Sequence, residues 1–434
     1  MIADLKPYAE YKESGLPWLG QVPGHWEVRR LRASITDCVN GVWGADPNGE
    51  DDLICVRVAD FDRVKLRVRL RMKTVRAIPL SARSRRLLQR GDLLLEKSGG
   101  GDLQPVGAVV AYDYDEPAVC SNFVARMPVA IGYDSFFVNY LHFTLYAHRV
   151  NVRSIKQTTG IQNLDGKAYL SEPVAFPPLA EQAAIVRFLD WANGRLERAI
   201  RAKRKVIALL NEQKQAIIHR AVTRGLDPSV SLKPSGIPWL GDIPQHWEVR
   251  RAKYLYREVN ERSTDGSEEL LSVSHLTGVT PRSQKNITMF KAASYEGHKL
   301  CQPGDLVVNT MWAWMGALGV STHAGIISPA YAVYRPHQPD GIIGIYMDSL
   351  LRSRPYVSNI ICRSTGLRAS RFRLYPEEFF RLPIIQPPPN EQRLIVEAIR
   401  RETVELDTAI SRLNREIELL REYRTRLVAD VVTG

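Results

Sequence analysis

A segment near the start of the chain recurs almost unchanged in its second half, and this duplication restricts the folds that the chain can adopt. Residues 14–30 read SGLPWLGQVPGHWEVRR and residues 235–251 read SGIPWLGDIPQHWEVRR, with thirteen of seventeen positions identical at an offset of 221. A shorter echo follows, because residues 177–182 (PPLAEQ) and 387–392 (PPPNEQ) each open a long helical pattern. The period is too long for a solenoid repeat. It has the size of a domain plus a helix, so we expect two similar modules.

The two long helical patterns each carry an apolar seam. Each pattern begins just after a Pro-Pro pair, which cannot lie inside a helix. The second seam follows alternating three- and four-residue steps, as in a coiled coil, through Ile399, Leu406, Ile410, Leu413, Ile417, Leu420, Leu427 and Val431. The first stripe is broader and contains Leu189, Ala192, Leu196, Ala199, Val206, Leu210 and Ile217. Two matched seams in one chain favour mutual pairing over two isolated surface helices.

The lengths of the helix and the linker fix the direction of that pairing. A helix of about 43 residues is roughly 64 Å long, whereas an eleven-residue linker spans at most about 36 Å. The second globular domain must therefore start near the far end of the first helix, and the second helix must run back. We expect an antiparallel pair with a twofold axis perpendicular to its length.

The expected architecture is α+β, with two globular domains separated by an antiparallel coiled coil of two long helices in a pseudo-twofold internal repeat. Its expected parts are a first domain (residues 1–176, with an initial segment 11–30), a first spacer helix (177–223), a linker (224–234), a second domain (235–386) and a second spacer helix (387–434). The repeated Pro/Trp segment is interpreted as a packing element, because rigid Pro and Trp at equal places suit a scaffold contact. The histidines in it are read as structural.

Composition narrows the classes of partner and compartment. The 434 residues carry a net charge of +12, which favours an acidic partner such as nucleic acid or an anionic membrane. Residues 306–334 lack Asp, Glu, Lys and Arg and are long enough to span a bilayer. Gly, Pro, Asn and His interrupt this stretch, so we expect buried strands there and no membrane contact. The five cysteines are scattered without metal-binding spacing, and the first residues have no apolar core typical of a signal peptide. A cytoplasmic protein with reduced thiols is expected.

A dense basic run is the first candidate binding feature. Residues 63–90 contain eleven Lys or Arg and no Asp or Glu, and residues 63–73 alternate basic and apolar side chains. Strict alternation predicts a strand with one apolar and one basic face. A solvated face is the simple explanation, but adjacent like charges are costly unless an anion neutralises them. The predicted phosphate-binding residues are Arg63, Lys65, Arg67, Arg69, Arg71 and Lys73.

Polar loops are the candidates for base recognition, because base edges require directed hydrogen-bonding groups. The predicted residues of the first domain are Lys97, Ser98, Lys156, Gln157, Thr158, Thr159, Gly160, Gln162 and Asn163. Those of the second domain are His275, Arg282, Asn309, Thr310, Ser364, Thr365, Gly366, Arg368 and Arg371. The Gly-rich pieces could equally be simple turns. Trp312 and Trp314 lie in an apolar stretch and are expected in the core, with stacking on bases as the alternative.

Motifs for catalysis are missing from the sequence. It contains no GxxxxGK[ST] phosphate loop, no strand-linked GxGxxG, no [DNS]-P-P-[YFW] methyltransferase motif, no HExxH and no credible PD…(D/E)xK nuclease core. We therefore expect no catalytic residue, no bound cofactor and no metal site in this chain. An enzyme that carries its own catalytic site in this single chain is disfavoured for the same reason.

The doubled SGxPWLGxxPxHWEVRR segment, the Thr-Gly loops and the PPxxEQ helix starts resemble the specificity subunit of type I restriction–modification systems. The resemblance covers essentially the whole chain. It implies that residues 1–176 and 235–386 are target recognition domains, each reading one half of a split, asymmetric site in double-stranded DNA. It also implies that the loops at Thr159-Gly160 and Thr365-Gly366 face DNA, while the helices set the spacer.

The resemblance further implies that the chain itself is not catalytic. In that family two methyltransferase subunits dock on the specificity subunit and methylate adenine with S-adenosylmethionine. Restriction subunits, where present, use ATP and magnesium to translocate and cleave DNA. The alternative function left open by the sequence is a DNA-binding coiled-coil regulator without a methylation partner.

Overall fold

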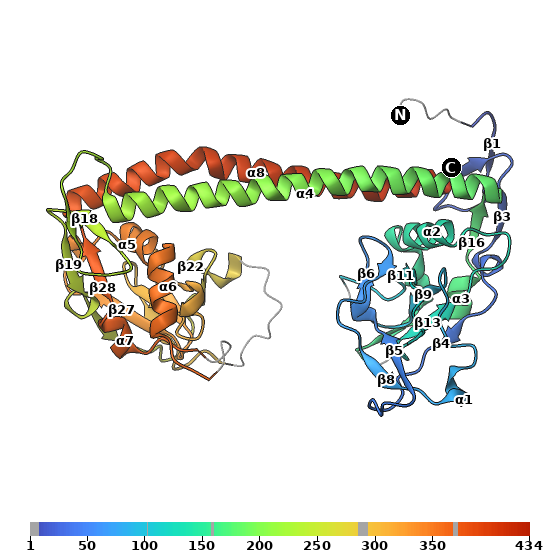
Figure 1. Cartoon of the computed structure of the whole chain (residues 1–434), viewed down its shortest axis with the longest axis horizontal. Helices are drawn as coiled ribbons and strands as arrows, with labels where there is room; N and C mark the ends of the chain where they lie inside the picture. Colours follow the sequence, from blue (N-terminus) through green and yellow to red (C-terminus); the bar gives the residue numbers. More distant parts are fainter. Residues whose placement is uncertain (1–7, 102, 158–159, 285–293, 368–371) are drawn as a thin grey trace. The chain divides into compact units, whose positions relative to one another are not determined.

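The computed structural model of the chain describes residues 8–101, 103–157, 160–284, 294–367 and 372–434 (Figure 1). These residues form two compact units, each with its own core. Unit 1 contains residues 1–202 and 415–434, and unit 2 contains residues 203–414. The cuts fall inside the two long helices, so each unit holds one segment of both.

Unit 1 is built on a six-stranded sheet. The strand order is β4 (Val39–Asn40), β13 (Val124–Met127), β9 (Leu93–Glu96), β11 (Val109–Ala111), β7 (Arg67–Val68) and β6 (Phe61–Asp62). A three-stranded sheet follows the order β12 (Ala118–Cys120), β5 (Asp52–Val56) and β8 (Val75–Ala77). The short helices are α1 (Leu80–Arg83) and α3 (Gly166–Leu170).

Helix α2 (Ser135–Ala147) covers one face of the unit 1 sheet (Figure 1). Asp134 caps its start, because the carboxylate accepts hydrogen bonds from the N–H groups of Phe136 and Phe137 at 2.9 and 3.0 Å. The buried face of α2, which includes Leu141, packs in one core with the apolar side chains of β9. Burial of this face holds the helix on the sheet.

Unit 2 repeats this plan with a four-stranded sheet. The strand order is β20 (Tyr256–Val259), β27 (Ala332–Pro336), β24 (Leu306–Val308) and β25 (Leu318–Val320). Two further pairs are β21 (Leu271–Ser274) with β22 (Gly278–Pro281) and β23 (Lys299–Cys301) with β26 (Gly325–Ile327). Helices α5 (Gly344–Leu351), α6 (Arg354–Arg363) and α7 (Pro376–Phe380) complete the unit. The uncharged stretch 306–334 is therefore strands and turns, as expected, and no described helix is long and apolar enough to cross a membrane.

The repeated sequence segments form the same structure in both units. In unit 1 the hairpin β1 (Tyr11–Glu13) and β2 (Gln21–Pro23) leads into β3 (Glu27–Arg30), which pairs with β16 (Pro173–Phe176). In unit 2 the hairpin β17 (Leu232–Pro234) and β18 (Asp242–Pro244) leads into β19 (Glu248–Arg251), which pairs with β28 (Pro383–Gln386). Trp26 and Trp247 are fully buried at the same place. The predicted packing role of the segment is confirmed.

A buried ion pair marks a second equivalence between the two sheets. In unit 1 Asp92, just before β9, accepts from Arg126 Nε of the neighbouring β13 at 2.6 Å. In unit 2 Asp305, just before β24, accepts from Arg335 Nε of the neighbouring β27 at 2.8 Å. Both aspartates are at most 5% exposed. The strands β9 and β24 therefore occupy the same position in the two units.

The motif at the start of each long helix ties that helix to its globular domain. In unit 1 Glu181 Oε2 binds His25 Nε2 at 2.8 Å and Oε1 accepts from Trp26 Nε1 at 3.0 Å. Buried Gln182 accepts from the N–H of Asp134, which caps α2, at 2.9 Å and donates to the carbonyl of Pro177. The pair Glu181-Gln182 thus joins the start of the long helix to the repeated Pro/Trp segment and to the start of α2, which lie far apart in sequence.

The same joint recurs in unit 2. Glu391 Oε2 binds His246 Nε2 at 2.7 Å. Gln392 Oε1 accepts from the N–H of Ile343, at the start of α5, at 2.9 Å, and its amide donates to the carbonyl of Pro387 at 2.8 Å. The structural role expected for His25 and His246 is confirmed.

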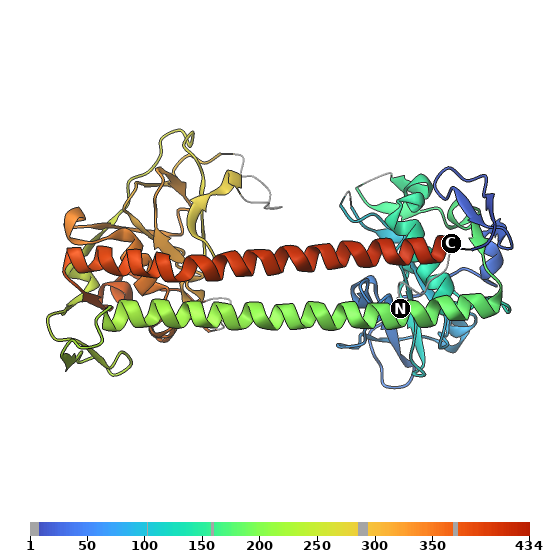
Figure 2. The same cartoon turned by 90° about the horizontal axis from the view of Figure 1, so that it is seen from above.

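The long helices α4 (Leu179–Arg224) and α8 (Pro389–Thr433) lie antiparallel within each unit. In unit 1 the first turns of α4 run beside the last turns of α8 (Figure 2), and Arg424 binds Glu197 at 3.1 Å. In unit 2 the last turns of α4 run beside the first turns of α8, and Lys214 binds Asp407 at 2.6 Å. The predicted antiparallel helix pair is confirmed.

The predicted strand over residues 63–73 is wrong. Strand β6 ends at Asp62, and within residues 63–73 only the two residues of β7 form a strand. The carboxylate of Asp62 accepts hydrogen bonds from the N–H groups of Val64 and Lys65 at 3.1 and 3.0 Å, and Leu66 adopts a left-handed conformation with φ 55°. An Asp side chain that bonds to the backbone two and three residues on forms a turn. This local turn overrides the alternating pattern.

Replacement of Gln392 by alanine tests the joint. The side chain is 1% exposed, and its removal leaves the Ile343 N–H and the Pro387 carbonyl without their partner. We expect a loss of about 1–3 kcal/mol in unfolding free energy, seen as a lower denaturant midpoint. Exposed Gln213 of α4 provides the matched Gln→Ala control. Equal midpoints for the two variants would contradict the role of the joint.

Candidate nucleic-acid interface

Two of the polar loops predicted in unit 1 come together in the structure. Strand β10 (Ser98–Gly99) pairs with β15 (Gln162–Leu164), which pairs with β14 (Ile155–Gln157). Ser98 Oγ donates to Asn163 Oδ1 at 2.6 Å. The loop after β9 and the hairpin around Gly160 therefore form one small sheet, and the left-handed φ of 73° at Gly160 shapes its turn. Thr158 and Thr159 lie outside the described residues.

The side chains of this small sheet differ in their exposure to solvent and in their internal contacts. Gln157 and Asn163 are exposed, and so is Lys156, which binds Asp165 at 2.7 Å. That contact helps to hold the pKa of Asp165 at about 2. Lys97 is half-buried and donates to Asn40 at 2.7 Å. Gln162 is buried, and its amide oxygen accepts from the N–H of Val106 at 3.2 Å, so the structure gives this side chain an internal contact.

Two loops of unit 2 also meet. Thr365 and Arg373 form a two-residue bridge with hydrogen bonds of 3.0 and 2.9 Å, and the next residue, Leu374, donates its N–H to the carbonyl of Thr310 at 3.0 Å. This contact brings the loop after β24 beside the loop after α6. Thr365 and Gly366 are exposed at this place. Arg368 and Arg371 lie outside the described residues.

Other predicted residues of unit 2 are held inside the protein or on a separate hairpin. Asn309 is buried and donates to Tyr331 Oη at 3.0 Å, and buried Ser364 donates to the carbonyl of Ile360 at 2.8 Å. His275 is exposed at the turn between β21 and β22, where its carbonyl accepts from Arg352 at 2.8 Å. Arg282 follows that hairpin at the start of a short 3-10 helix.

Most cations of the basic run are neutralised by carboxylates of unit 1 itself. The recorded ion pairs are Arg63–Glu96, Arg67–Asp113, Lys73–Glu116, Arg76–Asp46, Arg83–Asp51, Arg85–Asp37 and Arg90–Asp113. The expected face of adjacent, uncompensated cations is therefore wrong, because partners distant in sequence supply the negative charge. Lys65, Arg69 and Arg71 are exposed, and no ion pair of theirs is recorded among the described residues.

The pair of Arg63 and Glu96 is the most deeply buried of these contacts. Arg63 Nη2 lies 2.8 Å from Glu96 Oε2, and the Glu96 side chain is only 2% exposed. Burial raises the pKa of Glu96, and the Arg63 guanidinium opposes this rise. Glu96 ends strand β9, so the ion pair fixes the start of the loop that carries Lys97 and Ser98.

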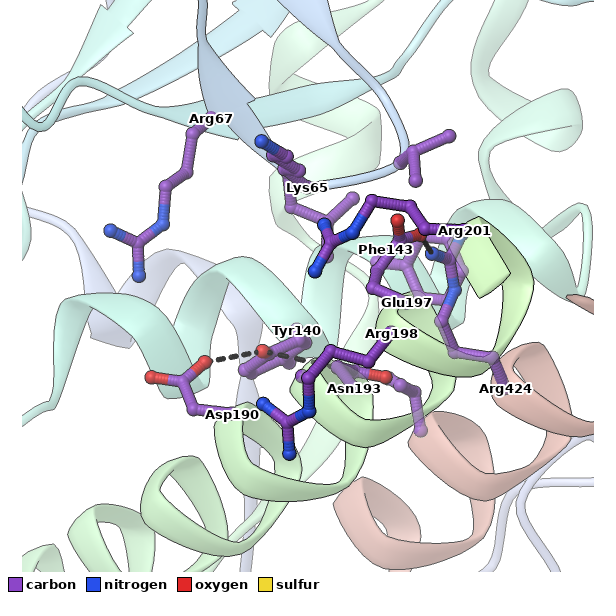
Figure 3. A pocket seen from close by; sticks show the side chains of 14 residues that line it. Lys65, Arg67, Tyr140, Phe143, Asp190, Asn193, Glu197, Arg198, Arg201 and Arg424 are labelled. Carbon is purple, nitrogen blue, oxygen red and sulfur yellow. Dashed lines mark hydrogen bonds and ion pairs between the residues drawn. The ribbon is translucent and has the colours of Figure 1, made fainter. Parts of the chain in front are cut away.

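A pocket of about 460 Å³ lies in unit 1 between the turn before β7, helix α2 and the two long helices (Figure 3). Its charged lining includes Lys65, Arg198 and Arg201, which are exposed. Tyr140 Oη donates to Asp190 on its floor at 2.8 Å, while Arg424 is bound to Glu197. The two carboxylates of the lining are thus engaged, and the exposed cations give the mouth of the pocket a positive charge.

Trp312 is not in the core, so that part of the expectation was wrong. Its side chain is 49% exposed, whereas Trp314 is half-buried. The residues 313–315 form a 3-10 turn closed by Gly316 in a left-handed conformation with φ 84°. The turn signal was present in the sequence as a glycine after the apolar run. Two exposed aromatic residues of unit 1, Trp43 and Phe123, were not singled out by sequence reasoning.

Two curated relatives of this chain are type I restriction enzyme specificity subunits. No family model matches the chain. A type I restriction enzyme MjaVIII specificity subunit from Methanocaldococcus jannaschii is 32% identical over 115 residues, which are 26% of this chain and 25% of that protein. A putative type I restriction enzyme MjaX specificity subunit from the same organism is 25% identical over 243 residues, 53% of this chain and 52% of that protein. The chain thus spans a quarter to about half the length of these curated relatives.

A solved structure matches over nearly the whole chain. It comes from work on complex assembly and conformational transition of the type I R-M system, and it covers 95% of this chain and 99% of its own, with a TM-score of 0.62 and 15% identity. Because the identity is 15%, this match is evidence for the fold alone. The predicted α+β fold with two domains and a coiled coil is confirmed, and the curated relatives confirm the resemblance to type I specificity subunits.

Replacement of Arg63 by alanine tests the buried pair. The substitution leaves the Glu96 carboxylate buried without its cation, which destabilises proteins by about 3–5 kcal/mol. Because the folded-state pKa of Glu96 is raised, the folded state holds its proton more tightly than the unfolded state. The loss is therefore largest at neutral pH and shrinks as the pH falls towards that raised pKa. Denaturant unfolding at several pH values measures it.

The exposed Arg71 provides the control for this experiment, since its replacement by alanine removes the same charge without uncovering a buried carboxylate. A pH-independent loss in Arg63→Ala, or an equal loss in Arg71→Ala, would show that the pair does not stabilise the domain.

Proposed function

We propose that this chain is the DNA-recognition subunit of a type I restriction–modification complex, in which each unit reads one half of a bipartite, asymmetric site. The observation that carries the proposal is the contrast between repeated scaffold and unrepeated loops. The repeated residues are used in internal joints, as with Trp26 and Trp247, which are fully buried. The two loop clusters that reach solvent differ in sequence. Two equivalent frames with different exposed loops suit two different half-sites.

The proposed task needs positioning but no chemistry in this chain. DNA recognition separates contacts that fix the register on phosphates from contacts that read base edges. Lys65, Arg69 and Arg71 supply exposed cations for the first role. Exposed amide and hydroxyl groups, such as those of Asn163 and Thr365, suit the second. Neither unit requires a cofactor for this work, and we propose that none is bound here.

The proposed partners are double-stranded DNA and two methyltransferase subunits, with restriction subunits as a possible addition. The methyltransferase subunits would use S-adenosylmethionine, and restriction subunits would use ATP and magnesium. The long helices expose apolar side chains, including Leu209 of α4 and Val404 of α8, both more than half exposed. We propose that such exposed apolar side chains on the helices contact the partner subunits. A cytoplasmic location is part of this proposal.

The relatives favour this function over a DNA-binding regulator without a methylation partner, because they are specificity subunits of restriction enzymes. The two functions differ in one requirement. A specificity subunit acts only with a methyltransferase, whereas a regulator acts alone.

Methylation sequencing provides the direct test. The chain is co-expressed with the modification subunit encoded beside it, and the host genome is sequenced for methylated bases. We expect one split motif with two different halves and a fixed spacer, carrying methylated adenine. Neither protein expressed alone should produce it. Methyl transfer by this chain alone, or a regulatory effect with no methylation in its complex, would contradict the proposal.

A second prediction concerns the exposed cations. Simultaneous replacement of Lys65, Arg69 and Arg71 by alanine should weaken binding to all DNA sequences alike. The slope of log binding constant against log salt concentration should become less steep by the amount that about three phosphate contacts contribute. Fluorescence anisotropy with a random-sequence duplex at several salt concentrations measures both quantities. The control replaces Arg83 and Arg85, whose charges are paired with Asp51 and Asp37. An unchanged salt slope in the triple variant would remove these residues from the interface.

A further inference from the structure

The exposed indole of Trp312 lies where strand β24 ends and the loop cluster of unit 2 begins. Buried Asn309 follows the strand, and the backbone N–H of Trp312 donates to the backbone carbonyl of Asn309 at 2.9 Å. Half of the Trp312 side chain is accessible to solvent. Exposing a large aromatic surface is unfavourable in water, so its presence on a rigid turn requires an explanation.

The turn that carries Trp312 is rigid. The N–H groups of Met315 and Ala317 both donate to the Trp312 carbonyl, at 2.9 and 3.2 Å. The indole of Trp312 stacks on that of Trp314, with ring centroids 5.9 Å apart and planes inclined by 19°. Trp314 is itself fixed, because its Nε1 donates to the carbonyl of Met311 at 3.0 Å. The outer face of Trp312 is thus presented in a fixed orientation, which lowers the entropy lost on binding.

The surroundings of this indole match a nucleic acid. Trp314 packs edge-on against Phe372, with ring centroids 6.3 Å apart. The next residue in sequence is the exposed Arg373. Arg373 is bridged to exposed Thr365, and this bridge leads to Thr310 through Leu374. An aromatic surface in the same loop cluster as a cation and hydroxyl groups suits a base attached to its phosphate backbone.

Unit 1 places an aromatic surface at the equivalent strand end. A pocket of about 490 Å³ follows β9, and its lining includes Trp43, Phe123, Asn122 and Ser98. Both rings are exposed, by 38% for Trp43 and 45% for Phe123. The Arg76 guanidinium lies 4.8 Å from the centre of the Trp43 ring, which fixes the indole from behind. Trp43 follows β4 and Phe123 precedes β13, so unit 1 places exposed aromatic rings near this strand end with residues from other parts of the chain.

We propose that Trp312 in unit 2 and Trp43 in unit 1 are specificity-determining residues that contact bases of the bound DNA, each within the half-site read by its own unit. The indole packs on the face of a base or against a thymine methyl group, contacts that depend on base identity and on local unstacking. This inference rests on the proposed function, and it adds an aromatic contact in each unit to the polar base contacts proposed above.

The test is a selection from a pool of double-stranded DNA with a 40-base-pair random region, using the full chain purified with its modification subunit. Five proteins are compared, namely wild type, Trp312→Ala, Trp312→Phe, Trp43→Ala and Tyr254→Ala. Tyr254 is 62% exposed in unit 2 and lies apart from the loop cluster in sequence, so it provides the matched aromatic control. Thermal unfolding of each variant reports folding separately.

We expect the wild type to enrich one bipartite motif. Trp312→Ala should lose preference at one or two positions of one half only and bind the wild-type motif about tenfold more weakly. Trp43→Ala should lose preference in the other half, and Tyr254→Ala should match the wild type. Trp312→Phe should retain part of the preference, because a smaller aromatic face remains.

Three results would overturn the inference. The first is an unchanged motif with unchanged affinity in both tryptophan variants, which would assign the indoles to a protein contact. The second is a loss of affinity that accompanies a lower unfolding temperature, which would assign them to folding. The third is a wild type that enriches no sequence, which would overturn the proposed function and this inference with it. Only the first two leave the proposed function intact.

Discussion

The structure depends on the Glu-Gln pair that starts each long helix. Gln182 and Gln392 are almost fully buried, and each accepts a hydrogen bond from the backbone N–H just before a domain helix, α2 in unit 1 and α5 in unit 2. The glutamate before each glutamine binds a histidine of the repeated segment. Because one rigid helix start bonds to both the entry segment and the domain helix, the direction in which the helix leaves the domain is fixed. A recognition device with two readers needs that direction to be constant.

The two joints are similar but not identical. Tyr8 donates to Glu181 in unit 1, and burial together with this contact raises the pKa of the tyrosine. Trp26 Nε1 also donates to Glu181, whereas buried Trp247 Nε1 finds no hydrogen-bond partner among the residues that the structure describes. Duplication thus preserved the geometry of the joint while its hydrogen bonding diverged. The same divergence, carried further, produced loops without common sequence on a common frame.

The frame could be predicted from the sequence because its signals are local or repeated. The Pro-Pro pairs mark the helix starts, the heptad seams form the helix pair, and the doubled Trp segments form the packing element. In each case the residues that give the signal also form the predicted structure. The charged run failed as a signal because its partners, such as Glu96 and Asp113, lie far along the chain. The turn at Asp62 also went unrecognised, although an Asp that bonds to its own backbone is a local feature. Exposure of Trp312 could not be inferred from apolar neighbours, because the 3-10 turn rotates it outward.

Unit 1 completes its core with a helix end that arrives from a distant part of the chain. Leu427, Val428 and Val432 of α8 belong to the main core of unit 1, together with Leu93 and Phe137. These residues follow residue 202 by more than two hundred positions. During synthesis, the first globular domain therefore emerges with an uncovered apolar surface that only the end of α8 can close. Translation past residue 432 is required before this domain reaches its final stability, so a nascent chain must be protected from aggregation until then.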